Sequence, residues 1–283
     1  MIGRLAIAFI GWSDGRLGSR QLIAPANGVA SESYATVHKH VRRKNRRFRV
    51  RFDRLFLSNF LHELSLQIGY WDRVANEKRF SHPVRLDWLG RYLRRTAKQA
   101  RIVDYGCGYG RTLGELRRAG YKNILGVDFS TGMLARCRLE LPGSSLVRND
   151  GRTLPLKNNS VDAVLLFAVL TCVPDSDEQR RQLREAVRVL RPGGLLYLSD
   201  LLINNDERNR ERYERYADVY QCYGVFELPE GVVVRHHRKE WIEELTTSLE
   251  RLEYEPFEVT TMNGNISSAF QYLGRKSTTS ENF

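Results

Sequence analysis

VDYGCGYGR, residues 103–111, is the stretch that decides the fold. It follows a short apolar run, Arg101–Tyr105, and precedes a segment with helical periodicity, Thr112–Ala119. Glycine lets a chain turn tightly, and it lets a ligand lie against bare backbone at the carboxyl edge of a parallel sheet. The position of this turn between a strand and a helix therefore predicts a ligand site that includes Gly106, Cys107, Gly108 and Gly110.

Apolar runs and amphipathic helices alternate on the C-terminal side of this turn. Further strands are expected at residues 123–129, 146–148, 161–169 and 195–199, and helices at residues 132–140 and 178–190. Such alternation is typical of a doubly wound parallel sheet. A helix over residues 239–252 then leads to two strands, residues 256–262 and 267–275, around the turn Asn263-Gly264, a hairpin signal. We predict an α/β fold with a mostly parallel seven-stranded sheet and a C-terminal antiparallel hairpin.

The net charge of +12 is distributed unevenly along the 283 residues. Residues 1–60 contain 12 Lys or Arg and 3 Asp or Glu, a charge of +9, so the rest of the chain contributes only +3. We interpret residues 1–60 as a basic, poorly ordered extension. Its densest stretch, residues 38–54, is either an arm that contacts RNA, DNA or anionic lipid, or a solvated tail.

Targeting and redox signals indicate a cytoplasmic protein. No apolar run approaches the roughly 20 residues that a bilayer span needs. The apolar stretch Leu5–Trp12 resembles a signal peptide only weakly, because charged residues follow it at once. The four cysteines are far apart, with no His at metal-ligand spacing, so we expect neither a disulfide framework nor a metal site.

The acidic residue ahead of the glycines separates two classes of ligand. The dinucleotide fingerprint G-x-G-x-x-G requires glycine at position 111, where this chain has Arg111. A carboxylate at Asp104 repels a pyrophosphate and attracts the ammonium group of an amino-acid moiety. The sequence therefore argues against a nicotinamide dinucleotide and for a ligand with a cationic group.

Two further acidic residues follow later strands of the predicted sheet. Asp128 is placed to accept hydrogen bonds from the ribose hydroxyls of a nucleoside, and Phe129 offers a flat face for the base. Asp150, after the strand at residues 146–148, is placed to accept a hydrogen bond from an adenine amino group. An isolated Asp at a strand end is as often a helix cap or a turn residue, but the ordered set of three acids favours a nucleoside site.

Five segments together resemble the successive motifs of a known family: VDYGCGYGR (103–111), GVDFSTGML (126–134), NDGRTLPL (149–156), VDAVLLFAVLTCV (161–173) and VLRPGGLLYLSD (189–200). They are similar to class I S-adenosylmethionine-dependent methyltransferases, in particular the type 11 group that includes the ubiquinone-biosynthesis C-methyltransferases. The resemblance covers roughly residues 70–275 and implies a methyltransferase domain over residues 61–283, with S-adenosyl-L-methionine as cofactor.

The resemblance also implies roles for single residues. It gives Asp104 and the Gly106–Gly110 loop the methionine part of the cofactor, Asp128 the ribose and Phe129 the adenine edge. It further assigns the adenine amino group to Asp150 with Gly151, the position beneath the sulfonium to Phe167, and a lid over the cofactor to Tyr70-Trp71-Asp72. Tyr70 and Trp71 fit a hydrophobic core equally well.

Residues 203–238 correspond to the segment that this family uses to cover the substrate. Within it, His236 and His237 are the candidates for a catalytic general base, and a structural or solvent-facing pair is the alternative. The aromatic residues Tyr220, Tyr223 and Phe226 are expected either to line an acceptor pocket or to pack in the core.

Three functions remain open from the sequence. The tetrad typical of amino-methylating enzymes is absent, since residues 167–170 read FAVL, which disfavours methylation of adenine or cytosine amino groups in nucleic acid. We favour a methyltransferase with a small-molecule acceptor. An RNA (tRNA) methyltransferase that grips phosphates through residues 38–54 is the alternative, and a non-catalytic scaffold with the same fold is the third.

Overall fold

The computed structural model describes residues 67, 69–76, 82–97, 99–261 and 263–278, which lie within one compact unit, Leu57–Phe283. The predictions for the extension 1–60 and for its basic stretch 38–54 fall outside the described residues. In the described part of the chain, no helix combines the length and the apolar character that crossing a membrane demands.

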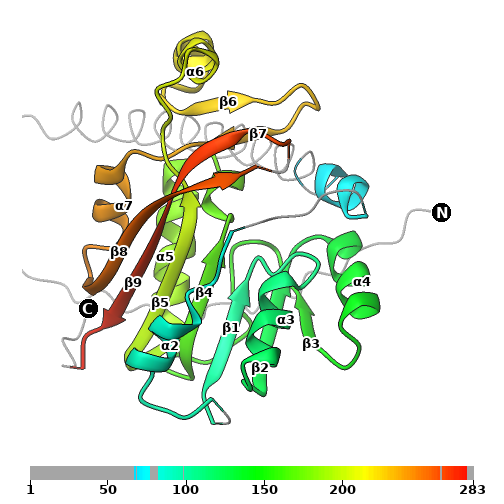
Figure 1. Ribbon diagram of the computed structural model, residues 1–283, viewed down its shortest axis with the longest axis vertical. Helices are drawn as coiled ribbons and strands as arrows, with labels where there is room; N and C mark the ends of the chain where they lie inside the picture. The colour runs from blue at the N-terminus through cyan, green and yellow to red at the C-terminus, as the bar shows by residue number, and fades with distance from the viewer. Residues whose placement is uncertain (1–66, 68, 77–81, 98, 262, 279–283) are drawn as a thin grey trace, which may run out of the picture. The chain divides into compact units, whose positions relative to one another are not determined.

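A seven-stranded sheet forms the centre of the fold, in the order β3-β2-β1-β4-β5-β9-β8 (Figure 1). The strands β1 to β5 run parallel, whereas β9 is antiparallel to both β5 and β8. This topology confirms the predicted α/β sheet with an antiparallel C-terminal hairpin. The bounds are β1 Arg101–Tyr105, β2 Asn123–Asp128, β3 Ser145–Arg148, β4 Val161–Phe167, β5 Leu190–Leu201, β8 Leu249–Thr260 and β9 Ile266–Lys276.

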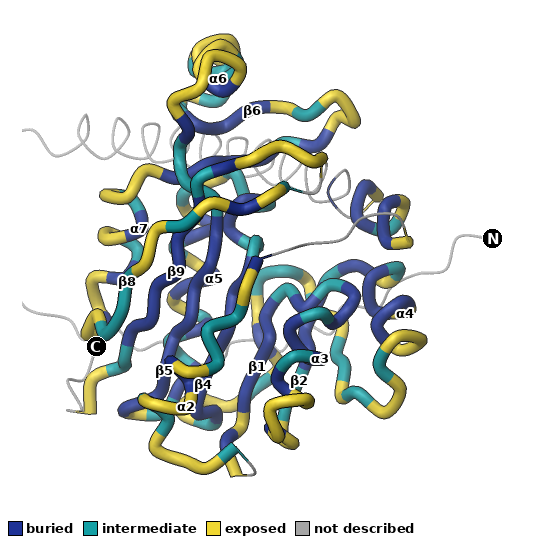
Figure 2. Tube along the Cα trace, viewed as in Figure 1, coloured by how far each residue is buried: buried dark blue, intermediate teal, exposed yellow. Residues whose placement is uncertain are grey.

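Helices cover both faces of the sheet, so its central strands are buried on both sides (Figure 2). Side chains alternate between the faces along each strand. Val164 and Leu166 of β4 therefore join one hydrophobic cluster, while Ala163 and Leu165 join the other. The helices are α2 Leu86–Tyr92, α3 Arg111–Arg118, α4 Thr131–Glu140, α5 Ser176–Val189, α6 Glu207–Tyr220 and α7 Lys239–Leu245.

The helix predicted over residues 239–252 is too long. Helix α7 ends at Leu245, and the Thr246 hydroxyl donates back to the carbonyl of Ile242. From Leu249 onward the backbone pairs with β9 as strand β8. Ladder pairing along the whole hairpin thus overrides the helical spacing of Trp241, Leu245 and Leu249.

The segment at residues 203–238, for which the sequence predicted no helix or strand, contains regular structure. It includes α6 and a two-stranded sheet made of β6 (Val225–Glu227) and β7 (Val233–Arg235). Helix α6 buries only Asn209 and Tyr213, so its sequence has no apolar stripe from which a helix can be predicted.

Candidate functional site

A cleft with about 880 Å³ of empty space, its open mouth included, lies at the carboxyl ends of β1, β2 and β4. In open α/β sheets ligands bind at this edge. Eight of the ten residues predicted to bind the cofactor line the cleft: Asp104, Gly106, Cys107, Gly108, Asp128, Phe129, Gly151 and Phe167. The other two, Gly110 and Asp150, are not among its lining residues.

Asp128 is fixed between two backbone segments of the cleft. One carboxylate oxygen accepts from the Gly108 N–H at 2.8 Å, and the other accepts from the Ser130 N–H at 2.8 Å. Burial raises the pKa of Asp128, and these backbone hydrogen bonds oppose the rise. Because a carboxylate oxygen has two lone pairs, each oxygen can accept a further bond from a ligand hydroxyl.

Asp104 is buried at the back of the cleft, and its Oδ2 has no hydrogen-bond partner. Burial raises the pKa of Asp104 to about 7, against the opposing effect of the Arg111 charge. A buried carboxylate without a partner carries a large desolvation cost. The residue therefore fits a ligand whose cationic group supplies the missing partner.

The two predicted residues outside the cleft have structural roles. Gly110 is the N-cap of α3, where a Cβ would overlap the Cys137 thiol of α4, so glycine permits close packing there. Asp150 is exposed, and its Oδ1 accepts from the Arg152 and Thr153 N–H groups in a turn. The other carboxylate oxygen of Asp150, Oδ2, accepts neither of these two hydrogen bonds.

Sequence reasoning missed two amide side chains of the cleft. Asn149 and Gln182 both line it, and the Oδ1 of Asn149 and the Oε1 of Gln182 are buried without hydrogen-bond partners. The Gln182 amide also donates to the carbonyl of Gly151 at 3.1 Å. Asn149 is the first residue of the motif NDGRTLPL (149–156), so its position next to Asp150 could have marked it. Gln182 belongs to none of the quoted motifs and reaches the cleft from α5 through the fold alone.

The helical residues 69–74 are attached to the start of α4 by Asp72. Its carboxylate accepts from the Ser130 hydroxyl at 2.6 Å and from the Gly132 N–H at 2.8 Å. Burial alone would raise the pKa of Asp72, but these hydrogen bonds lower it overall. Trp71 lines the cleft, whereas Tyr70 is buried in a hydrophobic cluster with Tyr213.

A second cavity, with about 760 Å³ of empty space, its open mouth included, adjoins the cleft. The two share Trp71, His82, Ala168 and Cys172 as lining residues. Apolar side chains form much of the wall of the second cavity. They are Leu201 of β5, Phe226 of β6, Val234 of β7, and Leu228 from the turn between β6 and β7. The arrangement offers one site for a cofactor and a neighbouring site for an acceptor.

The aromatic residues predicted for an acceptor pocket divide between two roles. Phe226 lines the second cavity. Tyr223 packs against Tyr213 at 5.3 Å between ring centroids, and Tyr220 against Tyr216 at 6.0 Å, and neither lines a cavity described here. For Tyr220 and Tyr223, the structure therefore supports a packing role.

His236 lines the second cavity, but its proton is placed unfavourably for a base. Its Nδ1 lies 2.6 Å from the Tyr213 hydroxyl, which can donate to it. The neutral ring then carries its proton on Nε2. Burial lowers the pKa of His236 well below its usual value. The residue is therefore suited to donate a hydrogen bond to an acceptor molecule.

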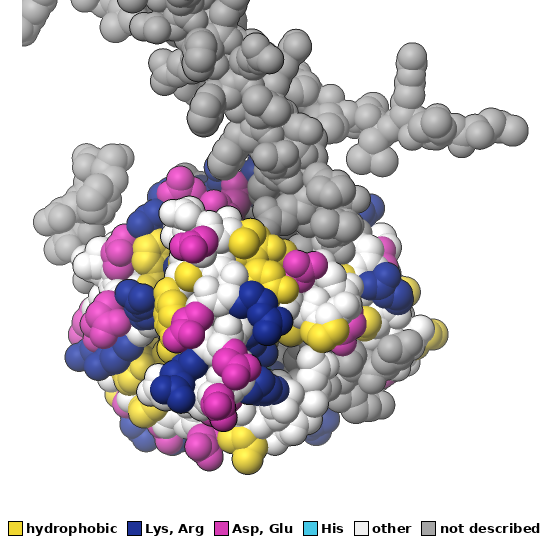
Figure 3. Space-filling view, turned by 90° about the horizontal axis from the view of Figure 1, so that it is seen from above, with side chains coloured by type: hydrophobic (Ala, Val, Ile, Leu, Met, Phe, Trp, Pro, Cys, Tyr) yellow, Lys and Arg dark blue, Asp and Glu magenta, His cyan; other side chains and the backbone are white. Residues whose placement is uncertain are grey.

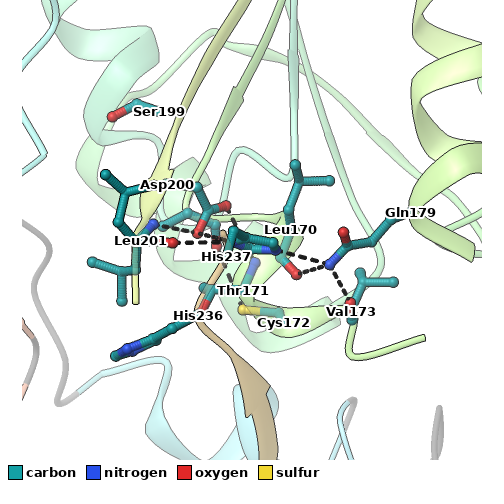
Figure 4. A network of polar contacts seen from close by, with 12 residues as sticks. Leu170, Thr171, Cys172, Val173, Gln179, Ser199, Asp200, Leu201, His236 and His237 are labelled. Atoms are coloured by element: carbon teal, nitrogen blue, oxygen red, sulfur yellow. Dashed lines mark hydrogen bonds and ion pairs between the residues drawn. The ribbon is translucent and has the colours of Figure 1, made fainter. Parts of the chain in front are cut away.

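His237 lines neither cavity and has both ring nitrogens engaged (Figure 4). Its Nδ1 donates to the Leu201 carbonyl at 3.0 Å, and its Nε2 accepts from the Gln179 amide at 2.9 Å. Burial lowers the pKa of His237 to about 3. This geometry does not favour a catalytic base at His237, because the ring connects Leu201 of β5 to Gln179 of α5. The Gln179 amide also lies within hydrogen-bond distance of the carbonyls of Leu170 and Val173.

His82 is a further histidine of the site that sequence reasoning missed. It lines both cavities and lies with its Nδ1 3.1 Å from the Ser199 hydroxyl. Burial, together with the Arg111 charge, lowers the pKa of His82 to about 4. No motif surrounds it in the sequence, so only the fold shows its position at the junction of the two cavities.

Comparison with known proteins agrees with this geometry. A family model described as a methyltransferase domain matches residues 103–198. An uncharacterized methyltransferase of Mycobacterium bovis is 32% identical over 190 residues, which cover 65% of this chain and 73% of that protein. The chain belongs to the S-adenosylmethionine-dependent methyltransferases. The type 11 resemblance and the cofactor predicted from the sequence are thereby confirmed.

Other members of the family share part of the chain or its fold. A phthiotriol/phenolphthiotriol dimycocerosates methyltransferase of Mycobacterium leprae is 38% identical over 119 residues, 39% of this chain and 43% of that protein. The chain thus spans about two fifths of the length of such relatives. A SAM-dependent methyltransferase structure from Methanosarcina mazei is 25% identical, with a TM-score of 0.62, and the match covers 70% of this chain and 99% of that one.

Proposed function

We propose that this chain transfers a methyl group from S-adenosylmethionine to a small-molecule acceptor held in the second cavity. The observation that carries the proposal is the pair of adjoining cavities, which share His82 and Ala168 at their junction. The bound cofactor supplies an electrophilic methyl carbon on a sulfonium. The remaining task of the protein is to align a nucleophile with that carbon and to exclude water.

Three residues would hold the cofactor in the cleft. Asp104, with its unpartnered buried oxygen, would pair with the ammonium group of the methionine part. Asp128 would accept from the ribose hydroxyls, and Phe129 would lie along the adenine. Asp150 remains a candidate for the adenine amino group through its Oδ2, next to Gly151 in the cleft wall.

In the second cavity, the side chains of this protein orient the acceptor molecule and do not remove a proton from it. His82 and His236 line the second cavity as neutral rings, and their lowered pKa values make proton transfer to them unfavourable near neutral pH. Each ring can form a hydrogen bond that orients the acceptor. Residues 203–238, through α6 and the β6–β7 hairpin, form part of the wall of this cavity and act as its substrate cover.

Relatives with known names support a metabolite acceptor. Matched proteins of Mycobacterium leprae and Mycobacterium tuberculosis are named for phthiotriol and phenolphthiotriol dimycocerosates, which are not nucleic acids. No observation in the described ranges between residues 67 and 278 favours RNA over such an acceptor, and the basic stretch 38–54 lies outside them. A small-molecule acceptor is therefore the function that the geometry supports best.

Calorimetric titration of S-adenosylhomocysteine tests the cofactor half of the proposal, with NAD as the control ligand. We expect binding of the first ligand and none of the second. Asp128→Ala should weaken binding by roughly 1–3 kcal/mol, because it removes a charged hydrogen-bond acceptor, whereas Asp218→Ala, at an exposed position of α6, should leave it unchanged. Folded protein that binds no S-adenosylhomocysteine would favour the scaffold function instead.

Cofactor binding should depend on pH through Asp104. Its pKa is raised to about 7, and the ionised form is needed to pair with an ammonium group. Below pH 7 the affinity for S-adenosylhomocysteine should fall by about tenfold per pH unit, and it should level off above. Titrations at pH 6 in two buffers of different ionisation enthalpy should show proton release on binding. Equal affinity at pH 5.5 and pH 8 would contradict this assignment.

A further inference from the structure

The second cavity contains positive charge without a balancing carboxylate. Arg208 and Arg212 of α6 both line it, and the described lining residues include no Asp or Glu. The nearest carboxylate to Arg208 in an ion pair is Asp206, at 3.9 Å, and no ion pair of Arg212 occurs among the described residues. Two cations therefore face a cavity whose other walls are apolar or neutral.

Arg212 is held at the wall of the cavity by an aromatic ring. Its guanidinium carbon lies 3.7 Å from the ring centroid of Phe226, in cation–π contact. Its Nε is buried without a hydrogen-bond partner. Burial lowers the pKa of Arg212, and the neighbouring Arg208 charge lowers it further, although a guanidinium stays charged in proteins. The partly desolvated cation is thus available to an incoming anion.

The outer surface differs from this cavity in its charge balance. A more open groove shares Arg208 and Arg212 with the cavity, but it is also lined by Glu211, Glu227 and Glu230. Figure 3, which looks down on the face that carries α6, shows Lys and Arg interspersed with Asp and Glu. Of the cavity and the groove, only the cavity combines these two arginines with a lining that contains no carboxylate.

We propose that Arg212, assisted by Arg208, selects acceptors that carry an anionic oxygen group, a carboxylate or a phosphate, on an apolar body. The apolar body lies against Phe226 and Leu228, and the nucleophilic end reaches the junction at His82 and Ala168. An arginine fork binds both types of oxyanion in a bidentate manner. The proposal rests on the proposed function, since it assigns an acceptor class to the same cavity.

Three eight-carbon probes test the charge requirement: octanoate, octyl phosphate and neutral 1-octanol. Each is titrated into protein saturated with S-adenosylhomocysteine. We expect at least one of the two anions to bind about tenfold or more tightly than 1-octanol. Tighter binding of octanoate would identify a carboxylate acceptor, and tighter binding of octyl phosphate a phosphate acceptor. Equal binding of all three probes, or no binding of either anion, would overturn the proposal.

Substitutions on α6 test whether the preference for anionic probes depends on Arg212. Arg212→Gln should abolish the preference for the anion, and Arg212→Lys should retain part of it. Arg210→Gln removes the same charge from an exposed position of the same helix outside the cavity, and it should retain the full preference. Binding of S-adenosylhomocysteine checks that each variant is folded.

The two proposals fail in different ways. Wild-type protein that binds no S-adenosylhomocysteine contradicts the methyltransferase function and the acceptor class together. Wild-type protein that binds it, with an anion preference that survives in Arg212→Gln, contradicts only the role of Arg212.

Discussion

Asp104→Asn weakens the binding of S-adenosylhomocysteine by more than about 100-fold, because loss of one partner of a buried ion pair costs roughly 3–5 kcal/mol. The substitution keeps the shape of the side chain at the back of the cleft and removes only its charge. The ammonium group of the ligand then enters a buried site without a counter-ion. Isothermal titration at pH 8, where wild-type Asp104 is ionised, measures the loss.

The same substitution should leave the folded protein as stable or make it more stable. The pKa of Asp104 in the folded protein lies above its usual value, so the group contributes stability below about pH 4 and loses that contribution as the pH rises through about 7. At pH 8 the wild type bears the full desolvation cost of the carboxylate, whereas the neutral amide of the variant does not. We expect the free energy of unfolding of Asp104→Asn at pH 8 to equal or exceed that of the wild type.

A matched control separates the charge effect from a general one. Asp218→Asn makes the same change at an exposed position of α6, and both its affinity and its stability should match the wild type. If Asp104→Asn binds S-adenosylhomocysteine as tightly as the wild type, the ammonium group does not lie at Asp104. Such a result would require a different orientation of the cofactor in the cleft.

Local signals predicted the sheet because each depends on neighbouring residues alone. The continuous apolar run that became β4 and the Asn263-Gly264 turn between β8 and β9 are both readable without tertiary information. The boundary of α7 was not, because pairing of Leu249 with Lys276 overrides local helical spacing. Helix α6 also escaped prediction, since a helix that buries only two residues has no hydrophobic period.

The cofactor side of the site was more predictable than the acceptor side for a similar reason. Asp104 and Asp128 lie at the carboxyl ends of β1 and β2, and the glycine turn follows β1, so their chain positions alone place them at one sheet edge. His82, Gln182 and Arg212 reach the cavities from elements far apart in sequence, and no spacing relates them. The adjacent pair His236 and His237 was misleading because the two rings lie in different environments, one on the cavity wall and one in a buried network.

Gly106→Ala should reduce the affinity for S-adenosylhomocysteine by at least about 100-fold, through the backbone and not through a lost contact. Gly106 has φ +81°, and a Cβ there would lie 2.5 Å from the Cγ2 of Val169. The left-handed conformation alone costs an L-residue roughly 1–2 kcal/mol. Relief of the overlap would displace the loop after β1, which positions the Gly108 N–H against Asp128.

Two comparison variants separate the overlap from the backbone conformation. Gly108→Ala also places alanine at positive φ, +53°, but the nearest atom to its Cβ is the Met133 sulfur at 3.9 Å, so only the conformational cost remains. Its affinity should fall less than that of Gly106→Ala. In the double variant Gly106→Ala/Val169→Ala the overlapping methyl group is absent, so part of the lost affinity should return. If the double variant regains no affinity for S-adenosylhomocysteine, steric overlap with Val169 is not the cause of the loss. The cofactor then requires the left-handed backbone conformation at Gly106 itself.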